Sequence, residues 1–510
     1  MTRSLKHAPV LVIGAGIMGA GIAQTAAQAG HPVMLFDTRD GAASTARDGI
    51  ASAFEKLIAK GRMQEDEARA TLARIRPAIS LHDAADAALV VEAIVEKLDV
   101  KRGLLRELEA IVARDCILAS NTSSISITAL ANGLQHPGRL VGMHFFNPVP
   151  LMKLVEVISG LHTDPAIAQA IYELASTWGK VPVHARSTPG FIVNRIARPY
   201  YAETLSLLLE RAAEPAVLDA CMRGAGFKMG PCELMDLIGH DTNLAVTESV
   251  FAANFGDKRY LPSVVQKDLV DGGLLGRKSG RGFYDYRSAV AAPASDTSVA
   301  PVGLPDARIV LHGSGPSTAR WALALTRAGK PFTQDSASGW TGITIDDAQL
   351  RQTDGRPAAQ VAAQAGVADL AVFDLPIAAD ATSGRHALAW ACAAGASPAW
   401  RASVPMFLSA ADLAPHEMAD AAGLVVARTI AMLINEAADA VQNGVCTAEG
   451  ADSAMKLGVN YPAGPFEWLA RWRAADVVQV LDHLDNFYRG DRYRVSPMLR
   501  HAAWREETRA

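Results

Sequence analysis

The stretch VLVIGAGIMG, residues 10–19, joins an apolar run to three glycines and then to a helical pattern. Residues 10–13 have the composition of a buried strand, and a helix is predicted over 20–29. In such a unit these glycines allow a tight turn, a close approach of the backbone to a pyrophosphate, and close packing of helix on strand. The first N–H groups of the helix then bind phosphate. The stretch therefore predicts a dinucleotide site built on Gly14, Gly16 and Gly19.

A second apolar run, residues 33–36, ends in Asp37, which stands 23 positions after Gly14. An acid at this place accepts hydrogen bonds from the ribose hydroxyls and repels a 2′-phosphate. Arg39, two residues later, is a feature that would favour the phosphate. We predict NAD, rather than NADP, as the cofactor.

The remainder of the N-terminal part alternates strands with helices. Strands are predicted at 88–93 and 116–120 with a helical stretch between them, and residues 39–75 read as an inserted helical segment. This alternation is typical of an α/β Rossmann domain with a parallel, doubly wound sheet. Residues 189–286 are mainly helical by pattern and are predicted to form a separate all-α domain.

The composition is that of a globular protein with several domains. A chain of 510 residues with a net charge of −4 has no basic field to attract nucleic acid or an anionic membrane surface. Its five cysteines form no CxxC pair, so neither a disulfide framework nor a metal site is predicted. Arg3 and Lys6 precede an apolar stretch that imitates a secretory signal, but the glycine spacing favours the cofactor site. We expect no membrane span and a cytoplasmic location.

Polar residues follow two further predicted strands. The SNTSS stretch, residues 120–124, either faces a ligand at the carboxyl end of the sheet or caps the next helix. His144 follows the apolar run 140–143, and Glu156 lies twelve residues later within the apolar run 154–157. A carboxylate among apolar residues needs a partner, and one that fixes an imidazole tautomer also stabilises the imidazolium. We therefore predict a dyad in which His144 is the general acid/base.

Several motifs in one order resemble the L-3-hydroxyacyl-CoA dehydrogenase family. Besides the glycine motif and SNTSS, they are VEAIVE at 91–96, HFFNPVP at 144–150, TPGFIVNR at 188–195 and GRKSGRGFY at 276–284. The resemblance covers residues 10–286, over half of the chain. It implies NAD-dependent hydride transfer from C3 of an acyl-CoA thioester, as in fatty acid β-oxidation, with His144 as acid/base and Glu156 as its orienting partner.

The same resemblance assigns further site residues. Ser123 and Asn194 match positions that hold the 3-oxygen of the substrate, and Lys60 matches one that meets the CoA moiety. Ala53 stands where the family pattern can place a serine that contacts CoA. The cofactor pocket, in addition to its glycines and Asp37, is assigned to Met18, Glu96, Lys101, Asn121, Asn147 and Lys278.

The sequence of the second half of the chain indicates a degenerate repeat of the first. Residues 309–315 match residues 10–16, residues 422–428 match 189–195, and Glu436 matches Glu203. Asp452 likewise matches Asp219, and the Gly-Pro pair at 464–465 matches the pair at 230–231. The copy has lost the catalytic function, because the segment that contains HFFNP and the glutamate partner of the histidine is missing from it. Three of its residues are also unsuited to a cofactor or substrate site: Pro316, Thr318 and Ala427.

We therefore expect five segments and one active site per chain. The segments are a Rossmann domain at 1–187, a helical domain at 188–286, a linker at 287–303, a degenerate Rossmann-like unit at 304–412 and a second helical domain at 413–510. The repeat suggests that the second helical domain packs on the first within one chain, as a dimer partner would. A homodimer and a monomer with this intrachain pseudo-dimer both remain open.

Two other functions compete with the enzyme above. A different Rossmann dehydrogenase, acting on a small β-hydroxyacid or a nucleotide sugar, would explain the glycines but not the joint presence of SNTSS, HFFNP and Glu156. A non-catalytic NAD-binding protein is compatible only with the second half.

The acyl chain is also open. Long family members with a degenerate second half are associated with phenylacetate catabolism and 3-hydroxyadipyl-CoA, as against short straight-chain substrates. A distal carboxylate would need a cation, and three lie nearby in sequence: Lys153, Arg195 and Arg198.

Overall fold

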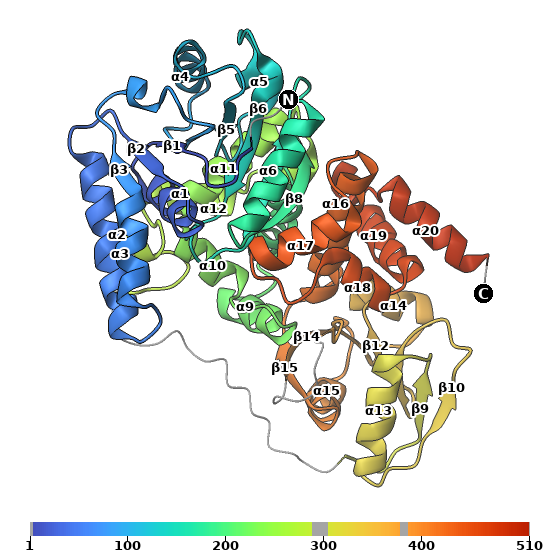
Figure 1. Ribbon diagram of the computed structural model, residues 1–510. Coiled ribbons are helices and arrows are strands. Elements are labelled where there is room, and N and C mark those ends of the chain that lie inside the picture. Colours follow the sequence, from blue (N-terminus) through green and yellow to red (C-terminus); the bar gives the residue numbers. More distant parts are fainter. Residues whose placement is uncertain (1–3, 288–303, 378–385, 509–510) are drawn as a thin grey trace. The chain divides into compact units, whose positions relative to one another are not determined.

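The computed structural model describes residues 4–287, 304–377 and 386–508, which fall into two compact bodies (Figure 1). The first body contains residues up to Arg195 together with Ala440–Val459, and the second contains Ile196–Asp439 and the residues from Asn460 onward. The predicted linker at 287–303 lies, except for its first residue, outside the described residues.

The first body is built on a sheet with the strand order β3-β2-β1-β4-β5-β6-β7-β8. Neighbouring strands are parallel except β6 and β7, which are antiparallel. The predicted parallel arrangement holds for the strands from which it was inferred, whereas β6 and β7 are antiparallel because the connection between them is too short for a crossover helix. The strands are β1 (Val10–Ile13), β2 (Val33–Phe36), β3 (Ile75–Pro77), β4 (Leu89–Glu92), β5 (Ile117–Ser120), β6 (Leu140–Phe145), β7 (Leu154–Ser159) and β8 (Val181–Arg186).

Helices cover the sheet and form the predicted insertion. Helix α1 begins at Ile17, earlier than predicted, because Gly16 in extended conformation already serves as its N-cap. The insertion at 39–75 consists of two helices, as expected. The helices of this body are α1 (Ile17–Gln28), α2 (Ala42–Ala59), α3 (Glu65–Arg74), α4 (Leu98–Ile111), α5 (Ile127–Ala131), α6 (Pro165–Thr177) and α17 (Ala448–Gly458); α7 (Val193–Ile196) starts at its boundary.

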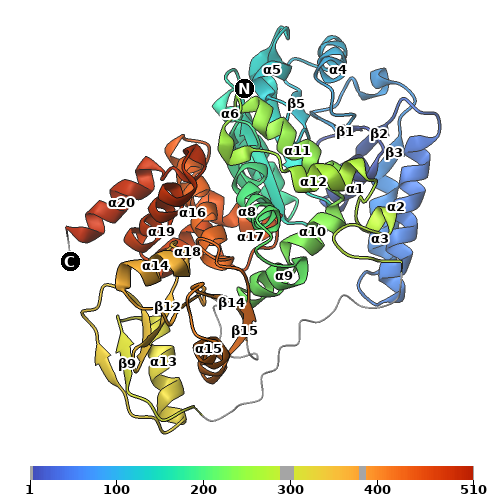
Figure 2. The ribbon, with the colours of Figure 1, turned by 180° about the vertical axis from the view of Figure 1, so that it is seen from behind.

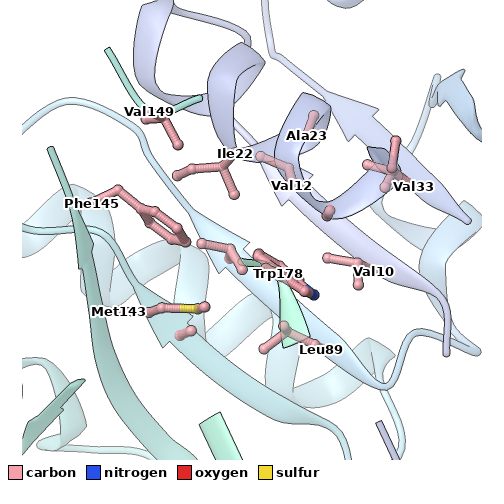
Figure 3. Close-up of a cluster of buried hydrophobic side chains, with 14 of the residues drawn as sticks. Val10, Val12, Ile22, Ala23, Val33, Leu89, Met143, Phe145, Val149 and Trp178 are labelled. Atoms are coloured by element: carbon pink, nitrogen blue, oxygen red, sulfur yellow. The ribbon is translucent and has the colours of Figure 1, made fainter. Parts of the chain in front are cut away.

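The core of the first body lies between the sheet and its helices (Figure 3). Val12 and Phe145 from the sheet meet Ile22 of α1, and all three are at most 2% exposed. The strands are apolar on both faces because helices cover both. Burial of one such side chain contributes about 1.5–3 kcal/mol.

The second body contains a mixed sheet and most of the helices (Figure 2). The strand order is β10-β9-β11-β12-β13-β14-β15. The strands are β9 (Ile309–His312), β10 (Thr333–Asp335), β11 (Gly342–Ile345), β12 (Ala348–Gln352), β13 (Leu370–Phe373), β14 (His386–Cys392) and β15 (Leu413–Glu417). The helices are α8 (Arg198–Leu209), α9 (Pro215–Gly224), α10 (Pro231–Ile238), α11 (His240–Ala253), α12 (Val264–Asp271), α13 (Pro316–Arg327), α14 (Ala358–Ala365), α15 (Pro398–Ala410), α16 (Val426–Gln442), α18 (Pro465–Arg471), α19 (Ala474–Tyr488) and α20 (Pro497–Glu507).

Within the second body, the two helical repeats contact each other reciprocally. Glu203 of the first repeat accepts hydrogen bonds from the side chains of Arg492 (2.8 Å) and Tyr493 (2.9 Å) of the second. The matching Glu436 accepts hydrogen bonds from Arg259 (3.3 Å) and Tyr260 (2.6 Å) of the first. This exchange of equivalent contacts is the pattern of a two-fold interface between like units.

No helix among the described residues is long and apolar enough to cross a membrane.

Candidate active site

The glycine turn after β1 has the geometry that a dinucleotide requires. Gly14 has a φ of +98°, and a methyl group there would lie 2.5 Å from the carbonyl oxygen of Ala93. A methyl group on Gly19 would lie 1.7 Å from the carbonyl oxygen of Gly14, so helix and turn could not approach as they do. Around Gly16, by contrast, such a group would meet nothing within 4 Å among the described residues. The turn is thus tightly packed on one side and open at Gly16, where a pyrophosphate can approach the start of α1.

Asp37 stands at the end of β2, beside this turn. Its Oδ2 accepts the N–H of Ala15 at 2.8 Å, and Arg39 forms a two-pronged contact through Nε to Oδ1 (3.0 Å) and Nη2 to Oδ2 (3.1 Å). The hydrogen bonds from Arg39 lower the pKa of Asp37 to about 2. The carboxylate is therefore ionised and fixed. These residues fit NAD, since the turn offers room for the pyrophosphate and Asp37 offers acceptors for the ribose.

His144 and Glu156 face each other across β6 and β7. They are directly paired in the antiparallel register, and His144 Nδ1 lies 2.6 Å from Glu156 Oε2. The prediction that the strand ends at Met143 is wrong by two residues, because pairing with β7 extends β6 through Phe145. The carboxylate is fully buried and the imidazole nearly so.

The second oxygen of Glu156 is held by backbone. Oε1 accepts the N–H groups of Ile192 and Val193, each at 3.0 Å, where the chain turns into α7. That turn is unusual, because Phe191 has a φ of +46°. The ring of Phe146 lies 4.5 Å from the imidazole, centroid to centroid. Each polar atom of the carboxylate thus has a partner, and the dyad is fixed from two sides.

Ser123 and Asn194 are brought together in the first body. Asn194 Nδ2 donates to the backbone oxygen of Ser123 at 3.4 Å. Glu96 Oε1 accepts the N–H groups of Ser123 (2.9 Å) and Ser124 (3.1 Å) and the hydroxyl of Thr122. Ser126, and not the SNTSS stretch, provides the side-chain cap of α5. SNTSS is therefore a separately anchored loop at the carboxyl end of β5.

Lys101 lies in an ion-pair network, and its assignment to the cofactor pocket stays a prediction. Its side chain is 1% exposed, and its Nζ lies 2.8 Å from Glu92 Oε2 and 3.3 Å from Glu96 Oε2. Burial raises the pKa of Glu96, but the charge of Lys101 and the hydrogen bonds from Thr122 and Ser123 outweigh it, so the net pKa is lowered. Lys101 is a buried counter-ion beneath the SNTSS loop.

Two residues of this region were missed by sequence reasoning. Glu92 is fully buried and also accepts the hydroxyl of Ser120. Lys180 donates from Nζ to the backbone oxygens of Val149 and Met152, and burial lowers its pKa to about 8. A polar residue inside an apolar run was a usable signal for Glu92. No local pattern singles out Lys180.

The other predicted residues of the first body are partly or fully exposed around this edge. Asn121 Oδ1 accepts the N–H of Phe145 at 2.8 Å and so holds β6 next to His144. Asn147 is exposed directly after β6, and Met18 is half-buried in the first turn of α1. Lys60 is exposed at the C-cap of α2, and Lys56 is exposed one turn before it.

Lys278 belongs to the second body. It lies in the short helix Arg277–Ser279, where its Nζ forms an ion pair with Asp241. Its role at the cofactor stays a prediction.

Residues that match this site in the second body form hydrogen bonds with the protein backbone instead. Thr318, in place of Gly19, donates its hydroxyl to the backbone oxygen of His312 at 3.2 Å. Asp374, directly after β13, accepts the N–H groups of Val425 (2.9 Å) and Val426 (2.7 Å). These two residues match Ile192 and Val193, so Asp374 makes the structural contacts of Glu156, and no histidine among the described residues bonds to it. Sequence reasoning missed this acid, although it ends an apolar run.

Comparison with known families finds three matching models. The model of the 3-hydroxyacyl-CoA dehydrogenase NAD binding domain matches residues 9–188. The model of the C-terminal domain of the same family matches twice, at 190–286 and at 423–508. The model of the 3-hydroxybutyryl-CoA dehydrogenase reduced Rossmann-fold domain matches residues 350–421. The predicted duplication, with a worn Rossmann unit in the second half, is confirmed.

Individual relatives are similar over the whole chain or over its first half. The chain is 41% identical to 3-hydroxyadipyl-CoA dehydrogenase of Escherichia coli K12 over 97% of both chains. It is 46% identical to a probable 3-hydroxybutyryl-CoA dehydrogenase of Deinococcus radiodurans, over 54% of this chain and 99% of the relative. A crystal structure of 3-hydroxybutyryl-CoA dehydrogenase from E. coli K12 matches 99% of this chain and all of its own, with 39% identity and a TM-score of 0.87.

Proposed function

The chain belongs to the 3-hydroxyacyl-CoA dehydrogenase family, and we propose that it oxidises L-3-hydroxyacyl-CoA to 3-oxoacyl-CoA with His144 as general acid/base. NAD, the cofactor of this family's N-terminal domain, would be held by the glycine turn and Asp37 and would supply the acceptor for the hydride that leaves C3 of the substrate. The observation that carries the proposal is the 2.6 Å contact of His144 Nδ1 with the fully buried carboxylate of Glu156.

The dyad determines where the proton goes. When Nδ1–H of His144 donates to Glu156 Oε2, the lone pair of the imidazole lies on Nε2. As the C3–H bond breaks, Nε2 takes the proton of the 3-hydroxyl and the C3–O bond becomes a carbonyl. Glu156 then stabilises the imidazolium while the N–H groups of Ile192 and Val193 hold the carboxylate in place. In the reverse direction the same proton returns to the oxygen.

We assign Ser123 and Asn194 to the substrate's 3-oxygen, supported by their 3.4 Å contact and by the anchoring of Ser123 on Glu96. Donors fixed in advance stabilise developing charge at little reorganisation cost. Lys60 and Lys56 present ammonium groups on one face of α2, which suits the phosphates of CoA. Cofactor contacts by Met18, Asn121, Asn147 and Lys278 are part of the same proposal.

The test of the acid/base is His144→Gln, with the exposed His162→Gln as matched control. We expect His144→Gln to lower kcat by about 10²–10⁴, the usual contribution of a general base, while the Kd for NAD stays within about twofold. The control should keep the wild-type kcat. Turnover retained in His144→Gln would contradict the assignment.

We propose 3-hydroxyadipyl-CoA as the preferred substrate, on the likeness to the E. coli relative over nearly the full length. Lys153 is exposed and Arg195 is half-buried in the first body. Arg198 is buried in the second body, donates to Thr247 at 3.0 Å and lies over the ring of Tyr201. The decisive measurement is kcat/KM for 3-hydroxyadipyl-CoA beside 3-hydroxybutyryl-CoA. We expect the first to be at least about tenfold higher, and equal values would contradict the preference.

We further propose that the chain is a monomer whose helical repeats imitate a dimer, supported by the reciprocal contacts of Glu203 and Glu436. Sedimentation over a wide concentration range tests this state. The five-segment division and a cytoplasmic location are proposals of the same kind. The location is supported by five free thiols and is tested by cell fractionation.

A further inference from the structure

A helix from the second half of the chain belongs to the first body. Helix α17 lies against β7 and β8 at the end of the Rossmann sheet (Figure 1). The N–H of Arg186 in β8 donates to the backbone oxygen of Val445, just before α17, at 2.8 Å. A methyl group on Gly450 would lie 2.9 Å from Val183 Cγ1, so a larger residue would force α17 or this side chain to shift. The segment 440–459 therefore covers the edge of the sheet that would otherwise be open.

The last residue of α17, Gly458, touches the surroundings of the dyad. A methyl group on it would lie 2.6 Å from Leu154 Cδ2, 3.1 Å from Val193 Cγ2 and 3.7 Å from Phe146 Cε1. Leu154 opens the strand that carries Glu156, and the N–H of Val193 donates to that carboxylate. The ring of Phe146 packs on the imidazole of His144. Gly458 thus packs against three residues that contact or position His144 and Glu156.

The same contact occurs a second time in the molecule. Gly224 and Gly458 each stand six residues before the glycine of a Gly-Pro pair, at 230–231 and 464–465. In the second body, a methyl group on Gly224 would lie 2.2 Å from the backbone oxygen of Ala387 in β14. Each repeat thus packs the end of a matching helix, at a glycine, on the other repeat's sheet. The contact of α17 is therefore a built feature of the fold.

We infer that α17 is a positioning element for the catalytic dyad, with Gly458 as its key residue. This inference rests on the proposed roles of His144 and Glu156. Among the described residues, Asp374, the counterpart of Glu156 in the second half, contacts backbone N–H groups and not a histidine, whereas helix α17 of that half packs beside the dyad of the first. By keeping Leu154 and Val193 packed and dry, α17 fixes the strand and the turn between which Glu156 is bound. A shift of this surface would lengthen the contact of Glu156 with His144, and the strength of that contact depends on distance and desolvation.

The test uses the full chain with Gly458→Leu, which must displace Leu154, Val193 and Phe146. We expect kcat to fall at least about tenfold while the Kd for NAD stays within about twofold, because the glycine turn lies elsewhere in the sheet. The pH at which kcat/KM falls on the acid side should also move, since the imidazole would lose part of its partner. A simple loss of folded protein would lower kcat without moving that pH.

Three further variants make the outcome decisive. Gly458→Leu combined with Leu154→Ala restores space and should recover kcat to within about threefold of wild type. Gly395→Leu, at an exposed glycine with open space around it, is the control and should leave kcat and the pH profile of kcat/KM unchanged. Gly458→Ala presses on Leu154 Cδ2 and, less strongly, on Val193 Cγ2, and should shift the pH profile in the same direction even if the leucine variant fails to fold.

A wild-type kcat and pH profile in both Gly458 variants would overturn the inference. A loss of kcat with an unmoved pH profile and no rescue would overturn it as well. If the wild-type protein oxidises no 3-hydroxyacyl-CoA, the proposed function fails instead. If His144→Gln abolishes turnover and the Gly458 variants do not lower it, only the role of α17 fails.

Discussion

Replacing Glu156 with glutamine removes one charge from a fully buried site and leaves its shape nearly unchanged. Glu156 accepts three hydrogen bonds, from the N–H groups of Ile192 and Val193 and from His144. A glutamine has one carbonyl oxygen and one NH₂ group. If its oxygen keeps the two backbone N–H groups, its NH₂ group must face His144 Nδ1. The proton of the neutral imidazole then moves to Nε2, the nitrogen that should act as base.

The expected loss follows from these contacts. A hydrogen bond to a charged group contributes about 1.5–3 kcal/mol, which corresponds to about 10- to 150-fold in rate. The wrong tautomer adds to this, and the equivalent acid-to-amide change in Ser-His-Asp triads lowers kcat by about 10⁴. For Glu156→Gln we expect kcat to fall between about 10² and 10⁴. The fold should persist because the two backbone bonds are kept.

The assay is the appearance of NADH with saturating 3-hydroxyacyl-CoA, together with the Kd for NAD by calorimetry. The matched control is the exposed Glu173→Gln, which should keep both values. A loss of kcat below about threefold in Glu156→Gln would refute the argument that the carboxylate sets the tautomer. An equal loss of NAD affinity would mean that Glu156 acts on the cofactor site.

Two other predictions concern charged groups of the first body. Because Arg39 lowers the pKa of Asp37 to about 2, the affinity of the wild-type protein for NAD should not change between pH 8 and pH 4. In Arg39→Ala the pKa of Asp37 should lie near its usual value of about 4. The affinity of this variant for NAD should therefore fall about twofold at pH 4, where the carboxylate takes up a proton. Calorimetric titration at both pH values measures this, and parallel curves for the two proteins would contradict it. Lys101→Met leaves Glu92 buried without its ion pair, and should lower the free energy of unfolding by about 3–5 kcal/mol, whereas exposed Lys97→Met should change it little. Equal unfolding curves for these two variants would show that the buried pair contributes no stability.

Most of the cofactor site could be predicted from the sequence because its signals are local. A strand, a glycine turn and a helix follow one another within residues 10–28, and Asp37 ends the next strand. The conformational freedom of glycine and the N–H groups at a helix start depend on only a few neighbouring residues, so both can be recognised in the sequence. For Lys101 the resemblance gave only the assignment to the cofactor pocket, and its position in three dimensions adds ion pairs with the buried Glu92 and the exposed Glu96.

Both the sequence and the tertiary structure were needed to establish the pairing of His144 with Glu156. The sequence supplied a histidine after a strand and an acid in an apolar run, which already suggested a pair. Only the antiparallel turn from β6 into β7 put them directly opposite each other, and only the turn at 191–193 supplied the N–H groups that hold the acid. Register and strand direction depend on which segments pack together, and local propensity does not specify them.

The sequence by itself determined the family, the cofactor and the duplication of the helical domain, because each is written in contiguous motifs, and it predicted the pairing of His144 with Glu156. The tertiary structure alone decided what the second half contributes to the first body and how its own worn site is closed. Gly458 packs behind a dyad 300 residues earlier, and Asp374 binds amides some 50 residues later. Such contacts form where surfaces distant in sequence pack together. Which residues meet there depends on complementary shape and on the need of buried polar groups for hydrogen-bond partners.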